Sequence, residues 1–341
     1  MRIAVLILVM AAAAPILSGQ TAAPDAARQS LEQAQRQLEE GNAAEAIASL
    51  EQMASVQPPV HGVQHALGVA YYRTGKLAQA QSAFAKAIQE DPADLESVQM
   101  EGLVLYRLNQ PAAAIPFLER VRQWTPNANT DANYVLGLCY LNARRYDDAR
   151  GAFASEFGVP PGSASAHLLL GTMLMRLNLP EMAAQEASKA LQLSPDLPLA
   201  HFMLGEVFLY RADVARATEE FEQERRINPT YAGTYDRLGD VYERSGRLQE
   251  AQEALTKALS LDTSSTGPFI QMGKVLIRRQ DPQTATMYLK HAEAMDPGNA
   301  LTHTLLAQAY HKLGRELEAK QEADLASSIR ARQQPTLEPL K

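Results

Sequence analysis

The chain has 341 residues, of which 46% are hydrophobic and 6% aromatic, and its formal net charge is −7. This acidic balance argues against nucleic-acid binding through a broad basic face. Because Cys139 is the only cysteine, an internal disulfide is excluded and the fold must be held together by packing.

The first residues form a separate element. Arg2 precedes an uncharged apolar stretch over residues 3–17, and small residues follow at positions 21–23. These are the parts of a secretory signal peptide, and the apolar stretch is short for a membrane-spanning helix. We therefore expect residues 1–23 to be a signal peptide and the mature protein to be periplasmic or secreted, without stable membrane insertion. An uncleaved membrane anchor is the alternative.

A period of 34 residues, with a single interval of 35, runs through the rest of the chain. It is marked by alanine at Ala46, Ala80, Ala114, Ala149, Ala183, Ala217, Ala251, Ala285 and Ala319. Twelve residues before the alanine there is usually a glycine, often in a Leu-Gly pair: 67–68, 136–137, 170–171, 204–205 and 238–239. Self-similarity at this period predicts a solenoid built from repeated helix pairs.

Each period carries the boundaries of two helices. A proline, which a helix cannot continue through, follows the alanine by twelve residues at Pro58, Pro92, Pro126, Pro161, Pro195, Pro229 and Pro297. A bulky residue follows the alanine by four at Phe84, Leu118, Phe153, Phe221, Leu255 and Leu289. We expect the two helices to cross closely at the glycine, with the bulky side chain filling the space beside the crossing.

The turn between the two helices has its own signals. Glycine occupies one turn slot at Gly41, Gly75, Gly246 and Gly314. Where this glycine is missing, a proline stands two residues further on at Pro111, Pro180 and Pro282, at the first turn of the second helix. We interpret these as two interchangeable ways of building the same turn.

A tyrosine follows the glycine position by three residues at Tyr71, Tyr140, Tyr242 and Tyr310. Taken in order, the Leu-Gly, Tyr, Ala, Phe and Pro positions resemble the tetratricopeptide repeat family over roughly residues 27 to 333. The resemblance implies an all-α fold, a right-handed α-α superhelical solenoid whose first helices line a concave face that commonly holds extended peptides or helices. The array would cover residues 24–333, with 334–341 as a flexible tail. Its repeats would lie near 27–60, 61–94, 95–128, 130–163, 164–197, 198–231, 232–265, 266–299 and 300–333.

Two of these repeats depart from the pattern. Residues 27–60 are polar where the others are apolar, so we expect them to cap the array. The repeat at 130–163 follows the extra residue, and its second helix should end early at Gly158, before Pro160 and Pro161. A bend in the superhelix and a harmless loop adjustment are equally compatible with this irregularity.

One face of each first helix is separate from the core face. It carries the residues two before, two after and five after the Leu of the Leu-Gly slot. From the second repeat to the sixth this face is mostly apolar: His65, Val69, Tyr72, Leu103, Tyr106, Tyr134, Leu138, Leu141, Leu168, Met175, Phe202 and Leu209, with Gln99, Thr172 and Glu206 among them. We predict that this strip is a groove for a hydrophobic or amphipathic peptide. Packing of these side chains against one another between repeats is the alternative.

The same face turns acidic in the next repeat, at Asp236, Asp240 and Glu243. This trio could pair with a basic segment of a partner or simply keep the helix solvated. A ladder of basic residues also recurs at Arg73, Arg107, Arg176, Arg244, Arg278 and Lys312, near the ends of the first helices. Such residues could grip a partner's carboxylates, but a favourable interaction with the helix dipole is the simpler explanation.

Three histidines, His167, His201 and His303, share the slot three residues before the Leu. We interpret them as partly buried structural residues because no further metal ligands lie at close spacing. The sequence shows no phosphate-binding loop, nucleophile elbow or Cys/His metal spacing. We therefore predict no enzymatic activity, no cofactor and no bound metal.

The sequence thus predicts an exported scaffold that binds a protein or peptide in its concave groove. The alternative is a holdase-type chaperone, or a carrier, for hydrophobic clients. The sequence predicts neither the oligomeric state nor the identity of a partner.

Overall fold

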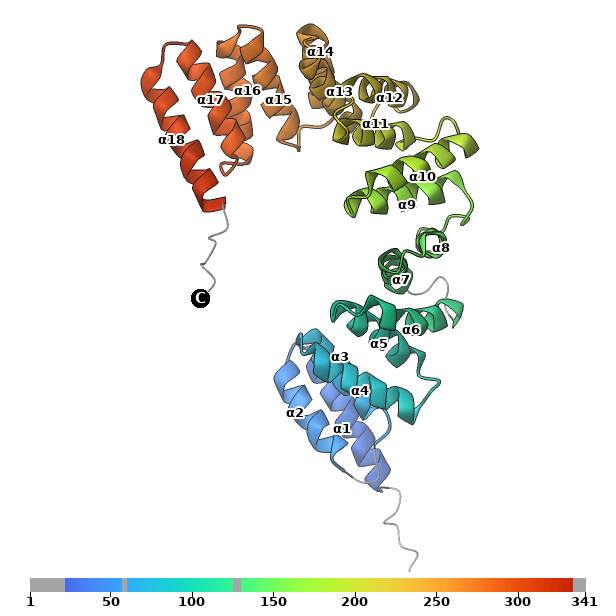
Figure 1. Cartoon of the computed structure of the whole chain (residues 1–341). Coiled ribbons are helices and arrows are strands. Elements are labelled where there is room, and N and C mark those ends of the chain that lie inside the picture. Colours follow the sequence, from blue (N-terminus) through green and yellow to red (C-terminus); the bar gives the residue numbers. More distant parts are fainter. Residues whose placement is uncertain (1–21, 57–59, 125–129, 334–341) are drawn as a thin grey trace, which may run out of the picture. The chain divides into compact units, whose positions relative to one another are not determined.

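The computed structural model describes residues 22–56, 60–124 and 130–333, so most of the predicted signal peptide, Pro58, Pro126 and the predicted tail lie outside it. Within these residues the regular structure is entirely helical, which confirms the all-α prediction (Figure 1). No helix in the described ranges has both the length and the apolar character needed to cross a membrane. The helices are α1 (Ala22–Glu39), α2 (Ala43–Ala54), α3 (Val63–Arg73), α4 (Leu77–Glu90), α5 (Leu95–Arg107), α6 (Pro111–Trp124), α7 (Thr130–Asn142), α8 (Tyr146–Glu156), α9 (Ala164–Arg176), α10 (Pro180–Leu193), α11 (Ala200–Tyr210), α12 (Val214–Ile227), α13 (Ala232–Arg244), α14 (Leu248–Leu261), α15 (Gly267–Arg278), α16 (Pro282–Met295), α17 (Ala300–Lys312) and α18 (Glu316–Gln333).

The chain divides into two compact units, residues 1–156 and 157–341. The division falls inside the irregular repeat at 130–163, directly after α8. This helix ends at Glu156, and Gly158 follows with φ +65°, so its early end is as predicted. The handedness of the whole superhelix stays a prediction.

Within each unit every helix packs on its neighbours in sequence, and the first helices also contact one another. In the first unit α3 contacts both α1 and α5, and α5 contacts α7. In the second unit α9 contacts α11, and α15 contacts both α13 and α17. Across the described residues the second helices make no comparable contacts with each other. The first helices named here therefore lie beside one another, which brings neighbouring first-helix faces together.

The predicted close crossing within a helix pair is confirmed at the glycines. A Cβ built on Gly137 would lie 2.5 Å from the ring of Phe153, and Gly205 meets Phe221 at the same distance. Both phenylalanines are fully buried. Since real Cβ atoms do not approach this closely, only glycine lets the ring lie flat against the first helix.

Two helix pairs make this crossing with other side chains. The α9–α10 pair has Ala187 where most other second helices have Phe or Leu, and Met203 from α11 reaches the space instead. Its Sδ would lie 2.6 Å from a Cβ on Gly171. In the α17–α18 pair both positions are small, Ala307 and Ala323. The residue at the crossing of the first helix is therefore small, and the side chain that packs on it differs from one helix pair to another.

The turn within a helix pair has the same backbone conformation in every pair of the described chain. Its glycines have φ between +71° and +88°, and the same slot has φ between +57° and +64° at Asn109, Arg144, Asn178, Ala212 and Gln280. The next residue donates its N–H to the carbonyl five residues earlier, as Lys76 does to Tyr71 at 2.9 Å and Asp213 to Phe208 at 2.8 Å. This is a Schellman motif. The interpretation that proline replaces glycine is therefore wrong: other residues adopt the left-handed conformation, and the prolines are additional.

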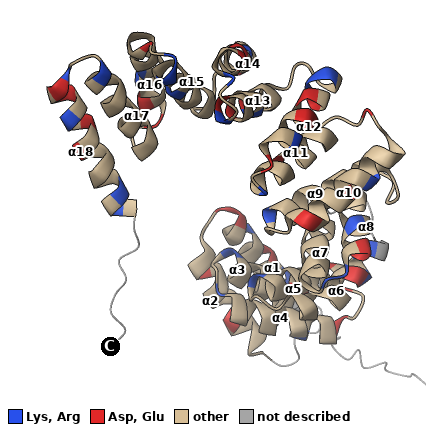
Figure 2. Ribbon diagram, turned by 45° about the horizontal axis from the view of Figure 1, so that its top comes forward, with Lys and Arg blue, Asp and Glu red and all other residues tan. Residues whose placement is uncertain are grey.

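The second helices end where the prolines predict. Four of them stop two residues before the proline, at Glu90, Leu193, Ile227 and Met295. The last helix, α18, begins with Glu316 and Glu318 and ends with Arg330 and Arg332 (Figure 2). This order of charges is favourable for the helix dipole.

Candidate partner-binding faces

In the first unit, the predicted binding face borders a hollow. His65 and Val69 of α3 are partly buried and line a space of about 320 Å³. Its wall comes from three first helices, through Gln35, Leu38, Glu39, His65, Ala66, Val69, Arg73 and Glu96. Residues from α1, α3 and α5, which are distant in sequence, therefore face one space.

His65 fixes one wall of this hollow. Its Nδ1 lies 2.8 Å from Ser97 Oγ and 3.2 Å from an Asp94 carboxylate oxygen. Asp94 also caps α5 by accepting the Ser97 N–H at 3.0 Å. Burial opposes ionisation of Asp94, but the bonds from Ser97 and the nearby His65 outweigh it and lower its pKa. These contacts tie α3 to the start of α5 and hold the hollow's lining in place.

The other predicted residues of the first unit are half-buried or buried. Tyr72 lies beneath the Arg107 guanidinium, 4.7 Å from ring centroid to Cζ. The Tyr134 ring lies 5.8 Å from that of Phe153. Of the remaining predicted residues, the partly buried ones are Leu103, Tyr106 and Leu138, and the buried ones are Gln99 and Leu141.

In the second unit, the predicted apolar residues pack within the chain. The Phe202 ring lies 5.5 Å from the ring of Phe221 and 5.3 Å from that of Tyr231. Leu209 packs against the same hydrophobic core. Leu168, Thr172, Met175 and Glu206 are partly buried. Packing between neighbouring helix pairs therefore accounts for the position of Phe202.

Two members of the predicted acidic trio make close ion pairs within the chain, and the third, Asp236, has Arg237 at 4.0 Å. Glu243 is 5% exposed; Lys274 Nζ lies 2.8 Å from its carboxylate, and Arg278 binds both that carboxylate and its backbone carbonyl. Although burial opposes ionisation, these cations lower the pKa of Glu243. Asp240 pairs with Arg244 at 2.9 Å. A partner's basic segment would have to displace these contacts.

Asp236, the third member, lies in a different environment. It lines a hollow of about 400 Å³ between α13 and the start of α15. Burial raises the pKa of Asp236 to about 6, against the opposing effect of Arg237. Among the described residues its Oδ1 is buried without a hydrogen-bond partner.

The basic ladder has a structural role at two of its positions. Arg73 donates to the backbone carbonyl of Leu38 at 3.1 Å, and Arg278 donates to that of Glu243 at 2.6 Å. In both cases the acceptor is near the end of the preceding first helix, where carbonyls lack a partner within the helix. These arginines therefore join one helix pair to the next.

The three predicted histidines each contact a glutamate 19 residues later, on the second helix of the same pair. The distances from Nδ1 are 2.6 Å from His167 to Glu186, 2.7 Å from His201 to Glu220 and 2.6 Å from His303 to Glu322. Burial opposes the charge on His303, but its bonds to Glu322 and to the Pro297 carbonyl outweigh this and raise its pKa. Sequence reasoning found the histidines but missed their partners.

A second recurring contact was also missed. Tyr71 donates its hydroxyl proton to Glu51 at 2.6 Å, and Tyr140 donates to Glu119 at 2.6 Å. The glutamate stands 20 or 21 residues earlier, on the preceding second helix. This spacing is visible in the sequence and could have identified the pairs.

Glu101 is a further residue that sequence reasoning missed. It occupies the slot that is Leu in most repeats, directly before Gly102, and it is 3% exposed. Burial raises the pKa of Glu101 to about 7, which the hydrogen bond from Gln81 only partly offsets. A carboxyl group thus stands in a leucine position of the core.

The comparisons with known proteins identify the repeat. Family models described as tetratricopeptide repeat match residues 37–100, 134–198 and 232–265. A model described as anaphase-promoting complex, cyclosome, subunit 3 matches residues 82–156. No curated protein matches the chain.

Several solved structures are similar to this chain at low sequence identity. MamA is 20% identical, with a TM-score of 0.44, and the match covers 48% of this chain and 95% of MamA. YrrB, described as a TPR protein with an unusual peptide-binding site, is 21% identical, with a TM-score of 0.47. The match covers 55% of this chain and 95% of YrrB. The matched chain of the Cut9–Hcn1 structure is 18% identical, with a TM-score of 0.46. The match covers 78% of this chain and 52% of that chain. On the family models and the helix pairs together, the chain contains tetratricopeptide repeats.

Proposed function

We propose that this protein is an exported interaction scaffold that holds a peptide or helical segment of a partner protein in a groove along its first helices. The observation that carries the proposal is the hollow lined by α1, α3 and α5. Because packing and hydrogen bonds fix its walls in advance, a partner would not bear the cost of ordering them. Repeat arrays commonly present such surfaces to partners.

The lining indicates what kind of segment would fit. Ala66 and Val69 give the hollow an apolar floor, whereas Gln35, Glu39 and Glu96 surround it with polar groups. A segment with one apolar anchor side chain and polar or basic flanks would complement this surface. With a net charge of −7 on the whole chain, we expect no nucleic-acid partner.

A photoreactive amino acid at position 96 tests the proposed groove. Glu96 is 72% exposed at its side chain, so the probe stands at the rim without disturbing the core. We expect ultraviolet irradiation of cells to join the chain to a discrete partner, detected by mass spectrometry. Adding Val69→Glu should reduce the crosslinked product about tenfold or more, because an unpaired charge would then face the partner's apolar anchor.

The matched control places the same probe at Leu317, whose 69% exposure makes it equally accessible on a helix outside the groove. The same product at position 317, or an undiminished product with Val69→Glu, would place binding elsewhere. Circular dichroism confirms that each variant is folded.

Export is a separate part of the proposal and rests on residues 1–23. Deleting them should leave the protein in the cytoplasmic fraction, whereas the full chain should be recovered from the periplasm or medium in a shortened form. An unchanged exported pool after the deletion would refute the assignment. Substituting Leu6 and Leu8 with alanine is a milder control, because it weakens the apolar stretch without removing it.

No structural observation favours the chaperone or carrier alternative. Promiscuous capture of unfolded clients needs a broad exposed apolar surface. Every residue of the predicted strip is partly buried or buried. We likewise assign no catalytic role to this repeat scaffold.

A further inference from the structure

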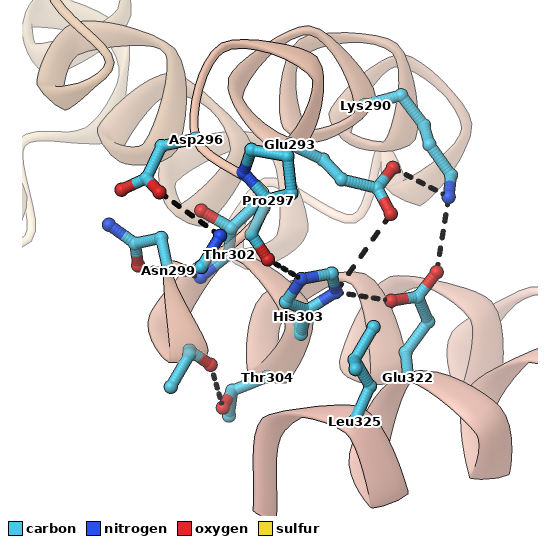
Figure 3. A network of polar contacts seen from close by, with 12 residues as sticks. Lys290, Glu293, Asp296, Pro297, Asn299, Thr302, His303, Thr304, Glu322 and Leu325 are labelled. Atoms are coloured by element: carbon cyan, nitrogen blue, oxygen red, sulfur yellow. Dashed lines mark hydrogen bonds and ion pairs between the residues drawn. The ribbon is translucent and has the colours of Figure 1, made fainter. Parts of the chain in front are cut away.

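A cluster of ionisable side chains joins the last three helices of the second unit. Lys290 and Glu293 come from α16, His303 from α17 and Glu322 from α18 (Figure 3). His303 Nδ1 lies 2.6 Å from one Glu322 carboxylate oxygen and 3.9 Å from one of Glu293. Lys290 Nζ bridges the remaining oxygens, at 2.8 Å from Glu293 and 3.1 Å from Glu322. Two carboxylates and an imidazole nitrogen thus converge on one point.

The other nitrogen of His303 fixes the orientation of the ring. Its Nε2 lies 3.0 Å from the backbone carbonyl of Pro297 and donates its proton there (Figure 3). In a neutral imidazole with this tautomer, the lone pair is on Nδ1 and points at the two carboxylates. Histidines that bind metals are commonly held in this way, through a second-nitrogen hydrogen bond to a carbonyl.

We propose that Glu293, His303 and Glu322 form a binding site for a divalent transition metal of the zinc class. Their donor atoms all lie within 4.8 Å of one another, so small side-chain movements would bring them around one ion. One imidazole nitrogen and two carboxylate oxygens suit zinc and its neighbours better than calcium or magnesium, which prefer oxygen alone. Water would complete the coordination.

Charge balance explains how the metal could enter. The Lys290 ammonium now lies between the carboxylates of Glu293 and Glu322. A divalent ion would take its place, so that two positive charges face the two negative ones. Because the Lys290 side chain is 45% exposed, its ammonium can move into water at little cost. The exchange leaves no uncompensated charge inside the protein.

The other two His–Glu pairs provide an internal comparison. Glu293 stands ten residues before His303, whereas the corresponding residues are Phe157 before His167 and Leu191 before His201. Neither of these can ligate a metal. The third ligand is therefore particular to the end of the array, where the ion would clamp α16, α17 and α18 together.

Titration of the untagged, chelator-washed protein with Co²⁺ tests the site, because visible absorption reports bound cobalt directly, and Zn²⁺ competition gives its affinity. We expect one equivalent to bind. Glu293→Gln should weaken binding about tenfold or more, since it removes a charged ligand. Lys290→Met should tighten binding, because it removes the competing ammonium. If the cluster were only a structural ion-pair network, Lys290→Met would not increase the affinity for cobalt.

The control variant is Glu220→Gln, which alters the pair with His201 and should leave cobalt affinity unchanged. Circular dichroism establishes that each variant is folded. Absence of binding to the parent protein, unchanged affinity in Glu293→Gln, or no gain in Lys290→Met would each overturn the proposal.

Discussion

Replacing Glu101 with leucine is expected to raise the free energy of opening α5 at pH 8 by about 3 kcal/mol. Burial raises the pKa of this carboxyl from 4.5 to about 7, and each pKa unit corresponds to about 1.4 kcal/mol. Leucine is the residue found in this slot at Leu67 and Leu136, and it has no charge to bury. The expected gain is therefore the cost of ionising Glu101 inside the core.

The sign of the pH dependence follows from the same shift. Below about pH 4.5 Glu101 is protonated in both states and its cost is absent. Between there and about pH 7 the unfolded chain has lost a proton that the folded chain keeps, so stability falls as pH rises. Above pH 7 both states are ionised and the curve flattens. Glu101→Leu should remove this slope.

Hydrogen exchange of the α5 amides at several pH values, corrected for intrinsic rates, measures the effect locally. Glu101→Gln is the matched control, since it keeps the shape and removes the charge, and it should also abolish the slope. If the local stability of α5 in the parent protein is the same at pH 5 and pH 8, the carboxyl does not carry this cost.

Gly205→Ala is expected to destabilise the second unit by about 2 kcal/mol. The added Cβ would lie 2.5 Å from the Phe221 ring, which is fully buried. Overpacking of this kind costs about 1 to 3 kcal/mol or more, and the roughly 1 kcal/mol gain in helix propensity offsets only part of it. Urea denaturation followed by far-ultraviolet circular dichroism measures the loss.

Gly171→Ala provides the comparison, because there the closest contact of the added Cβ is with a flexible side chain, the Sδ of Met203 at 2.6 Å, and the backbone oxygen of Ala183 is 3.3 Å away. Methionine can change rotamer, so the gain in helix propensity should nearly cancel the remaining cost. If the two variants lose the same free energy of unfolding, the packing of the Phe221 ring is not the reason that glycine is required at position 205.

The close helix crossing can be predicted from the sequence because the types of the residues at the crossing indicate it directly. A small residue at Gly137 and a large one at Phe153 recur at fixed spacing, and their contact follows from helix geometry. The turn is different. Arg144 and Ala212 have ordinary side chains that give no sign of a left-handed backbone, and only the repeat register with Gly75 identifies their conformation.

The binding face was predicted less completely because helical periodicity describes one helix at a time. It places Phe202 and Val69 on equivalent first-helix surfaces, but their surroundings come from other helices. Tyr231 packs edge-on against the ring of Phe202. Beside Val69, by contrast, Gln35 and Glu96 enclose a hollow. The first unit therefore supplies the candidate groove, and this difference depends on neighbours that a single-helix pattern does not include.

The left-handed turns give the array an uneven mechanical character. Four consecutive turns, at Asn109, Arg144, Asn178 and Ala212, hold a residue other than glycine in the left-handed conformation, which costs most residues about 1 to 2 kcal/mol and asparagine less. The turns at Gly41, Gly75, Gly246 and Gly314 avoid that cost, and outside the middle pairs only Gln280 among the described turns within helix pairs bears it. The strained turns lower the free energy of unfolding of the middle helix pairs. Under mechanical tension we therefore expect these pairs to unfold before the pairs at the two ends.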